Sequence, residues 1–221
     1  MKLSENTVSV LKNYSTINQN LMINAGSTLT TMSAMKNIVA RSTVAETFEK
    51  DIAIYDLNEF LAALSLFESP ELDFQENFVM MSNEGSSRSL KYFYSDPSVV
   101  TTVKRDITMP ECEVSFKFSD KELSDITKAA AVIGVPDMVL ENGSLRVTDK
   151  KNDTANHFAM EVDYVNPVEI DHKFWFKVEN LKLMLGTYEV AVSKNKISNF
   201  KNTNVDIEYF IALEPESYYG K

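Results

Sequence analysis

The hydrophobic pattern changes from strand spacing to helix spacing within one short stretch, residues 51–67, DIAIYDLNEFLAALSLF. Ile52 and Ile54 lie on alternate positions, as on one face of a strand. From Leu57 onward, with Phe60 next, the apolar residues recur at the three- and four-residue spacing of a helix. The junction has no glycine-rich loop to hold a phosphate, and its helix has no basic residue and no nucleophile. The pattern therefore predicts a strand-to-helix corner that packs and carries no chemistry.

A second corner repeats this pattern in the other half of the chain. The stretch KVENLKLML at 177–185 has the apolar spacing of DLNEFLAAL at 56–64, and Val178 falls against Leu57 at an offset of 121 residues. Alternating strand residues, Phe174 among them, precede the second corner as they precede the first. We therefore expect a helix at each corner.

Two further segments match each other upstream of these corners. SENTVSVLKNYSTIN begins at Ser4, and SDKELSDITKAAAVIG begins at Ser119, an offset of 115 residues. Each serine is placed to accept a hydrogen bond from a free N–H of the first helical turn. Glu122 completes a capping box with Ser119, whereas Thr7 after Ser4 gives only the weaker half. Two matches in the same order, at nearly one displacement, favour an internal duplication.

The rest of the chain reads as strands. Asn142-Gly143 is the clearest hairpin turn, because these residues tolerate the positive φ of a two-residue connection. The pattern strand–helix–three strands occurs four times, which predicts an α+β fold of two similar domains at 1–95 and 112–221, joined by a connector at 96–111 with two prolines. The expected strands are 21–24, 28–33, 38–47, 51–55, 71–74, 77–82, 88–94, 113–118, 137–141, 144–149, 157–165, 172–177, 187–193, 196–201 and 204–213.

Composition places the chain among ordinary globular proteins. It has 221 residues, of which 44% are hydrophobic and 24% charged, and it has no apolar run long enough to cross a membrane. The first residues do not resemble a secretory signal, and a lone cysteine cannot form an internal disulfide, so we expect a reducing cytoplasm. The net charge of −10 argues against a general coat for DNA but leaves room for a local basic surface.

Candidate catalytic residues are sparse. His157 and His172 have no Glu or Cys at metal-ligand spacing, and no motif near Cys112 would lower the pKa of its thiol. The stretch DKKND at 149–153 lacks the glycine and the terminal glutamate of a calcium loop. We expect neither an enzyme nor a bound metal or cofactor.

Positive charge gathers on the expected helices. Each lysine taken singly is typical of a solvated surface, and together they would bind phosphates weakly and with strong salt dependence. Lys121 and Lys128 are seven residues apart, so they share one helix face opposite the apolar stripe. The candidate DNA-facing residues are Lys2, Lys12, Lys121, Lys128, Lys177 and Lys182.

Four blocks of sequence resemble the sliding clamps of T-even-type bacteriophages, which are DNA polymerase processivity factors. They are MKLS..T...LKN..TIN at 1–18, D.AIYDLN.FL..LSL at 51–66, DPS.V from 96 and ALE..S at 212–217. The resemblance runs in order along almost the whole chain. Lys12, Lys128 and Lys182 match basic positions of the family, whereas Ala131 stands where the family has an arginine.

The resemblance implies a DNA clamp fold with two similar domains, each built from two β-α-β-β-β units. Three chains would close into a ring, with helices lining the hole and sheets outside. The ring would encircle duplex DNA without reading its sequence and hold the phage DNA polymerase for processive replication. It would act in the cytoplasm of the infected bacterial host, without contact to a membrane, and an ATP-dependent clamp loader would open and close it.

Further partners also follow from the resemblance. Peptide tails of the polymerase and loader would dock in an apolar pocket near the connector and the chain's end, and a sigma-like factor and a coactivator would bind for late transcription. The candidate pocket residues are Val99, Val100, Ile107, Met109, Ile211, Leu213 and Pro215. The alternative is a duplicated β-rich ring or assembly protein, such as a virion component, that does not thread DNA.

Overall fold

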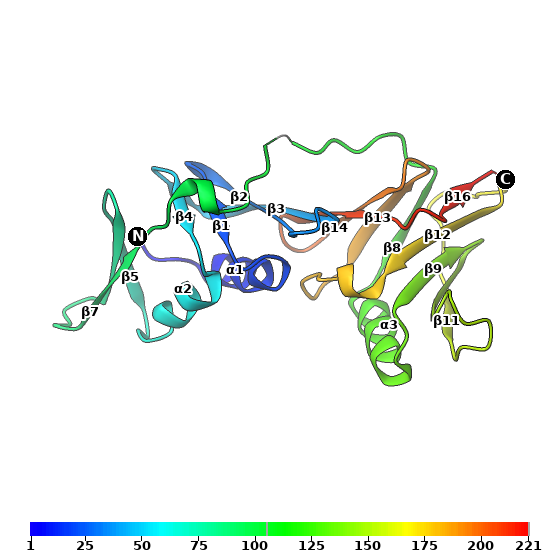
Figure 1. Cartoon of the computed structure of the whole chain (residues 1–221), viewed down its shortest axis with the longest axis horizontal. Coiled ribbons are helices and arrows are strands. Elements are labelled where there is room, and N and C mark those ends of the chain that lie inside the picture. Colours follow the sequence, from blue (N-terminus) through cyan, green and yellow to red (C-terminus); the bar gives the residue numbers. More distant parts are fainter. Residues whose placement is uncertain (105, 221) are drawn as a thin grey trace. The chain divides into compact units, whose positions relative to one another are not determined.

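The computed structural model describes residues 1–104 and 106–220, which form two compact units, one on each side of position 105. The predicted boundaries at 95 and 112 stay a prediction. In the first unit the elements are α1 (Glu5–Ile17), β1 (Leu21–Ile23), β2 (Gly26–Met32), β3 (Ile38–Phe48), β4 (Ile52–Ile54), α2 (Leu57–Leu64), β5 (Pro70–Phe74), β6 (Phe78–Asn83), β7 (Ser89–Phe93) and a 3₁₀ turn, Pro97–Val99 (Figure 1).

The second unit repeats much of this order. Its elements are β8 (Val114–Phe118), α3 (Asp120–Ile133), β9 (Asp137–Glu141), β10 (Ser144–Thr148), β11 (Phe158–Glu161), β12 (His172–Lys177), a 3₁₀ turn (Val178–Asn180), β13 (Tyr188–Ser193), β14 (Ile197–Asn202), β15 (Ile207–Ala212) and β16 (Tyr218–Tyr219). Every strand expected from the sequence is present, with ends that differ by a few residues. The short strand β16 was not expected.

The strand pairing of the two units is similar. β1 pairs with β4 in the first unit as β9 pairs with β12 in the second, always antiparallel. The hairpin of β2 and β3 corresponds to that of β10 and β11, although β2 has an irregularity near Gly26. The second unit also contains the ladder β8-β13-β14-β15, and the first contains β5-β6-β7. These parallels support the duplication inferred from the sequence.

The ladder between β8 and β13 in the second unit corresponds to only one bridged residue pair in the first unit. β8 pairs with β13 over five residues. At the corresponding place the N–H of Leu72 donates to the carbonyl of Met1 at 2.7 Å, and the Met1 ammonium donates to the carbonyl of Leu72 at 2.8 Å. Met1 therefore takes the place of the strand that precedes α3.

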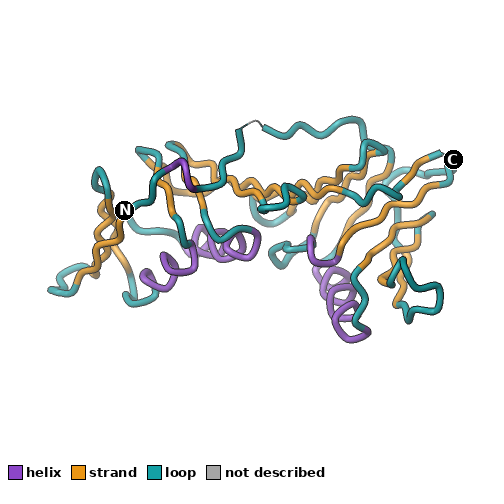
Figure 2. The backbone as a smooth tube through the Cα atoms, viewed as in Figure 1, coloured by secondary structure: helices purple, strands orange, loops and turns teal. Residues whose placement is uncertain are grey.

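The α-helices lie on one side of the strands in each unit (Figure 2). α1 packs on β3 and on its neighbour α2, and its residues Leu11 and Tyr14 are fully buried. In α2 the apolar stripe predicted from the sequence is buried, with Leu57 at 0% and Phe60 at 2% exposure. The corner at 56–64 thus has the packing role that its pattern predicted.

Aromatic side chains join the two sheets of the second unit. The rings of Phe176 on β12 and Phe200 on β14 meet edge to face, with centroids 6.1 Å apart. Tyr188 on β13 packs edge to face against both Phe200 and Tyr209. α3 covers β10 and β11 with Leu123 and Ile126, which are buried.

The helix expected at 177–185 is absent, and this prediction was wrong. Only the 3₁₀ turn Val178–Asn180 forms, and it begins without a capping side chain. The peptide groups of Met184 bind tyrosine side chains instead: its N–H donates to the Tyr209 hydroxyl at 3.1 Å, and its carbonyl accepts from Tyr188 at 2.5 Å. Tertiary hydrogen bonds therefore override a helical pattern that has no cap.

Candidate functional site

The N-terminus of α1 is closed by a residue from a distant strand. Ser4 accepts the N–H of Thr7 at 3.2 Å, as the sequence predicts. The missing half of the capping box is supplied by Glu46 on β3, whose carboxylate accepts the Ser4 N–H and the Thr7 hydroxyl. Burial opposes ionisation of Glu46, but the hydrogen bonds from Thr7 and Ser4 outweigh it and lower its pKa. This carboxylate fixes where α1 begins.

The first unit places two candidate lysines near α1. Lys12 is exposed on the helix, and among the described residues it has no ion-pair partner. Lys2 precedes the helix and lies 3.6 Å from carboxylate oxygens of both Glu71 and Glu84. Of these two lysines, only Lys12 has no ion pair with an acid among the described residues.

The two lysines of α3 differ in the same way. The Lys121 ammonium lies 2.5 Å from Asp125 on the next turn, and this hydrogen bond raises the pKa of the lysine. Lys128 is exposed, and within residues 1–104 and 106–220 it has no ion-pair partner. The intrahelical pair reduces the net charge that Lys121 offers to a ligand, while Lys128 keeps its full charge.

The remaining candidate lysines lie at the corner that forms no helix. The Lys177 ammonium lies 2.5 Å from Asp137, which is only 1% exposed, and 4.0 Å from Glu214. Lys177 thus neutralises a buried carboxylate. Lys182 is half-buried and belongs to the irregular stretch after the 3₁₀ turn, not to a helix face.

A network of charged side chains extends from Lys177 to Glu214 and Glu216, which follow β15. Lys150 places its ammonium 2.8 Å from Glu214 and 3.0 Å from Glu216, and its backbone N–H donates to Asp137 at 3.0 Å. This network was not foreseen from the sequence, because its members are far apart along the chain. It attaches the segment that follows β15 to β9 and β12.

The corner at α2 contains acids and no cation. Asp56 caps the helix by accepting the N–H groups of Asn58 and Glu59, and it also accepts the Gln19 side chain at 2.9 Å. The bond from Gln19 is the largest of the causes that lower the pKa of Asp56. Tyr92 donates to the Asp56 carbonyl, and burial together with the nearby acids raises its pKa to about 12. These contacts hold the corner in place.

A hollow of about 590 Å³ lies between α1, α2 and the segments beside them. Its lining mixes apolar side chains with charges of both signs, so it does not select one kind of ligand by charge. The lining residues are Lys2, Leu3, Glu5, Val8, Ser9, Lys12, Leu61, Leu64, Ser65, Phe67, Glu68, Ser69 and Pro70.

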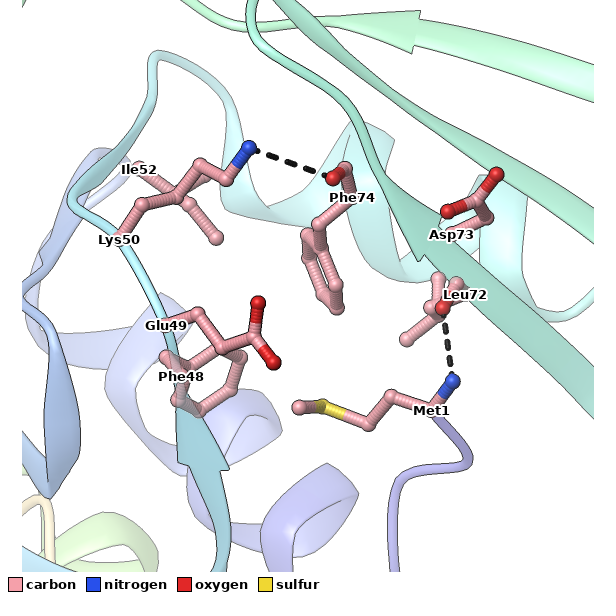
Figure 3. Close-up of a pocket in the computed structure, with 8 residues that line it drawn as sticks. All are labelled: Met1, Phe48, Glu49, Lys50, Ile52, Leu72, Asp73 and Phe74. Carbon is pink, nitrogen blue, oxygen red and sulfur yellow. Dashed lines mark hydrogen bonds between the residues drawn. The ribbon is translucent and has the colours of Figure 1, made fainter.

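A smaller pocket of about 180 Å³ lies where the end of β3 faces β5 (Figure 3). Phe48 and Phe74 form its apolar part, with ring centroids 5.8 Å apart. Lys50 donates to the Phe74 carbonyl at 3.3 Å across its upper rim, and the Met1 side chain reaches toward it from below. The pocket is too small for a drug-sized ligand.

The candidate peptide-pocket residues differ in exposure. Ile107 and Met109 are half-buried, and Pro215 is exposed. Val99 is 54% exposed, whereas Val100 and Leu213 are buried at 8% and 7%. Ile211 is at 0%, so its side chain is part of the core and offers no surface to a peptide.

The candidate catalytic residues lie in positions where they contribute to packing and hydrogen bonding. No group of three or more His, Cys, Asp or Glu that could hold a metal occurs in the described part of the chain. His172 is fully buried: its Nδ1 donates to the Ile170 carbonyl at 2.7 Å, and its Nε2 forms a hydrogen bond with the Tyr164 hydroxyl at 2.6 Å. Burial, reinforced by Glu113, raises the pKa of Cys112, which makes its thiol less reactive.

Among the described residues, no helix is long and apolar enough to span a membrane.

Comparisons with known proteins agree on one family. The family described as DNA polymerase processivity factor matches residues 2–102. A protein named Sliding clamp from Vibrio phage KVP40 is 33% identical over 223 residues, which cover 97% of this chain and 99% of that protein. The Sliding clamp of Enterobacteria phage T4 is 25% identical, with 98% of each chain covered.

A solved structure extends the comparison to the fold. The crystal structure of Proliferating Cellular Nuclear Antigen from Entamoeba histolytica has a TM-score of 0.71 and covers 96% of this chain and 97% of its own. At 14% identity this likeness concerns the fold alone. It confirms the clamp fold that the sequence resemblance implied.

Proposed function

The chain belongs to the sliding clamps, the processivity factors of DNA polymerase, and from this premise we propose that it encircles duplex DNA as a ring of three identical chains during phage replication. The correspondence with the KVP40 sliding clamp along almost the whole length of both chains carries the proposal. A clamp loader would open and close the ring with ATP in the cytoplasm of the infected cell. The clamp itself would hold the polymerase on DNA without catalysing a reaction.

The helices supply the surface that faces the duplex. Lys12 on α1 and Lys128 on α3 are exposed cations without an ion-pair partner among the described residues. They would attract phosphates and read no bases, which suits a protein that slides. Lys2 and Lys121 contribute less because acids offset them, and Lys177 is engaged with Asp137.

Two strand edges are suited to join copies of the chain. β7 ends the sheet β5-β6-β7, and β11 ends the sheet β11-β10-β9-β12-β16, so in the described chain each has one edge without a strand partner. β7 exposes Phe93 at 65% and carries Lys91, whose ammonium lies 4.4 Å from the ring centroid of Phe78. β11 exposes Phe158 and Glu161. Pairing of β7 with β11 of the next copy would cover aromatic surface and bring opposite charges together.

A charge exchange tests this pairing. Lys91→Glu and Glu161→Lys, each alone, should place like charges across the junction and lower the molar mass measured by light scattering from trimer toward monomer. Both substitutions in one chain should restore the trimer. Glu76→Lys, an exposed acid outside both edges, serves as the control. A trimer that persists in both single variants would rule out this pairing.

Partner peptides would dock on the apolar residues of the connector and of the segment after β15. In the second unit the exposed Pro215 and the half-buried Ile107 and Met109 support this proposal, and Val99 is an exposed apolar residue of the first unit. Ile211 is left out because it is fully buried. No described residue distinguishes a role in late transcription, which stays an expectation from the resemblance.

Retention on circular DNA tests the proposed function. With loader and ATP, the chain should remain on a nicked circular plasmid through gel filtration in high salt, because enclosure does not depend on ionic contacts. Cutting the plasmid once should release it from the ends. A ring-shaped virion component would not load, and a protein bound at a site would not respond to the cut, so either result would contradict the clamp.

A further inference from the structure

The two units differ at their second corner in a way that leaves apolar surface uncovered. In the first unit α2 lies against α1 and buries its apolar stripe. In the second unit the matching residues 178–185, here called the corner segment, form only a 3₁₀ turn and an irregular stretch. Leu185 at its end is 77% exposed.

A groove of about 470 Å³ lies between α3 and the beginning of the corner segment. Its floor is largely apolar, and the groove ends at the residues where a packed helix would begin. The lining residues are Thr127, Ala130, Ala131, Gly134, Val135, Pro136, Lys177, Val178 and Glu179.

Two tyrosines hold the corner segment in its observed form. Tyr209 accepts the N–H of Met184, and Tyr188 donates to the Met184 carbonyl. Both rings are fully buried and pack edge to face, so their hydroxyls are fixed in position. Among the described residues the N–H groups of Leu183 and Leu185 have no acceptor.

The sequence of the corner segment remains compatible with a helix. Val178, Leu181 and Leu185 share one face at helical spacing, and Gly186 follows, a residue that readily ends a helix. In such a helix the N–H of Met184 would bond to the carbonyl of residue 180 in place of Tyr209, a one-for-one exchange. The amides of Leu183 and Leu185 would gain acceptors.

We propose that the corner segment is a strap that folds into a helix over the groove beside α3, and that the hydroxyls of Tyr188 and Tyr209 hold it open. The helical form would place Leu185 on the same face as Val178 and Leu181, toward the groove, and the open form keeps the two tyrosine bonds. A missing N-cap and a length of two turns keep the helix marginal, so the balance is sensitive to the loss of either tyrosine bond. This inference does not depend on the proposed function.

Amide hydrogen exchange of the purified full chain, resolved to single residues, tests the strap. In the wild type, the amides of Leu183 and Leu185 should exchange rapidly. Tyr209→Phe and Tyr188→Phe keep the rings but remove the hydroxyls that bind Met184. In each variant the exchange of Leu183 and Leu185 should slow at least tenfold.

A helix-breaking substitution provides the control. Leu183→Pro in the Tyr209→Phe chain should abolish the protection of Leu185, whereas Leu183→Ala, which permits a helix, should keep it. The amides of β13 report whether each variant is folded. Unchanged exchange at both leucines in either folded tyrosine variant, or protection that survives Leu183→Pro, would overturn the proposal.

Discussion

Individual lysines on this chain have different partners, and the partners decide what each can do. Lys128 has no ion-pair partner among the described residues, whereas Lys177 lies 2.5 Å from the buried Asp137. In the sequence both appeared as basic residues on expected helices. The sequence could not reveal Asp137 as a partner, because burial of a carboxylate depends on the packing of β9 against β12.

Lys177→Ala should lower the free energy of unfolding by about 2–3 kcal/mol, since it leaves the Asp137 carboxylate buried without its cation. Lys128→Ala should change it by less than about 0.5 kcal/mol. Urea unfolding of both variants measures the difference. Adding Asp137→Asn to Lys177→Ala should recover part of the loss; equal stability of the two lysine variants would contradict this role of Lys177.

Cys112 should react slowly with a disulfide reagent at pH 8, because burial and the nearby Glu113 raise the pKa of its thiol. We expect a rate roughly tenfold below that of the same chain in guanidinium. Glu113→Gln should speed the reaction of the folded chain. A rate in the folded wild type equal to that of the denatured chain would show that the thiol is not suppressed.

At the scale of elements, the local sequence pattern predicted each α-helix that begins with a capping side chain. The capping box of Ser119 and Glu122 formed as predicted, and so did the bond from Thr7 to Ser4. The corner at 177–185 has the right apolar spacing but no cap, and tyrosines from β13 and β15 determined its form. A local sequence pattern cannot predict contacts between segments that are distant along the chain.

Glu46→Gln should destabilise the chain by about 1 kcal/mol at pH 7, because a neutral amide accepts the hydrogen bonds at the start of α1 more weakly. The pKa of Glu46 is lowered on folding, so its contribution is complete above the ordinary value of 4.5 and is lost as the pH falls through the lower folded value. The stability difference from wild type should therefore shrink below pH 4.5.

Thermal unfolding between pH 3 and pH 7 measures this dependence. Glu49→Gln, an exposed acid just beyond the same strand, is the matched control and should show little difference at any pH. A Glu46→Gln difference that is constant across the range would mean that the carboxylate charge is not the cause.

At the scale of the whole molecule, the duplication and the clamp fold could be predicted, since both depend on patterns repeated along the chain. The matching pairs β1-β4 and β9-β12 agree with the repeat found in the sequence. The candidate DNA surface was less predictable. Of six lysines, Lys12 and Lys128 remain as exposed cations without an ion-pair partner among the described residues, because ion pairing is a property of the folded surface.

Lys12→Glu with Lys128→Glu should reduce loading onto nicked circular DNA and leave the proposed trimer intact, because reversing two charges lowers the charge of the proposed inner surface by four units per chain. The defect should be largest at low salt, where phosphate attraction is strongest. Loading assays across a salt series measure it. Lys36→Glu with Lys201→Glu, an equal charge change at exposed positions off the helices, is the control.

The Asn142-Gly143 turn has a consequence for the chemical ageing of the protein. Deamidation needs the backbone nitrogen of the glycine to attack the asparagine side chain. Here the Gly143 N–H donates to Tyr164 at 2.8 Å, while the Asn142 side chain bonds to Asp171 and to the N–H of His172. These bonds keep the two reacting groups engaged elsewhere, so we expect the folded chain to acquire the acidic charge variant more slowly during storage than the denatured chain does.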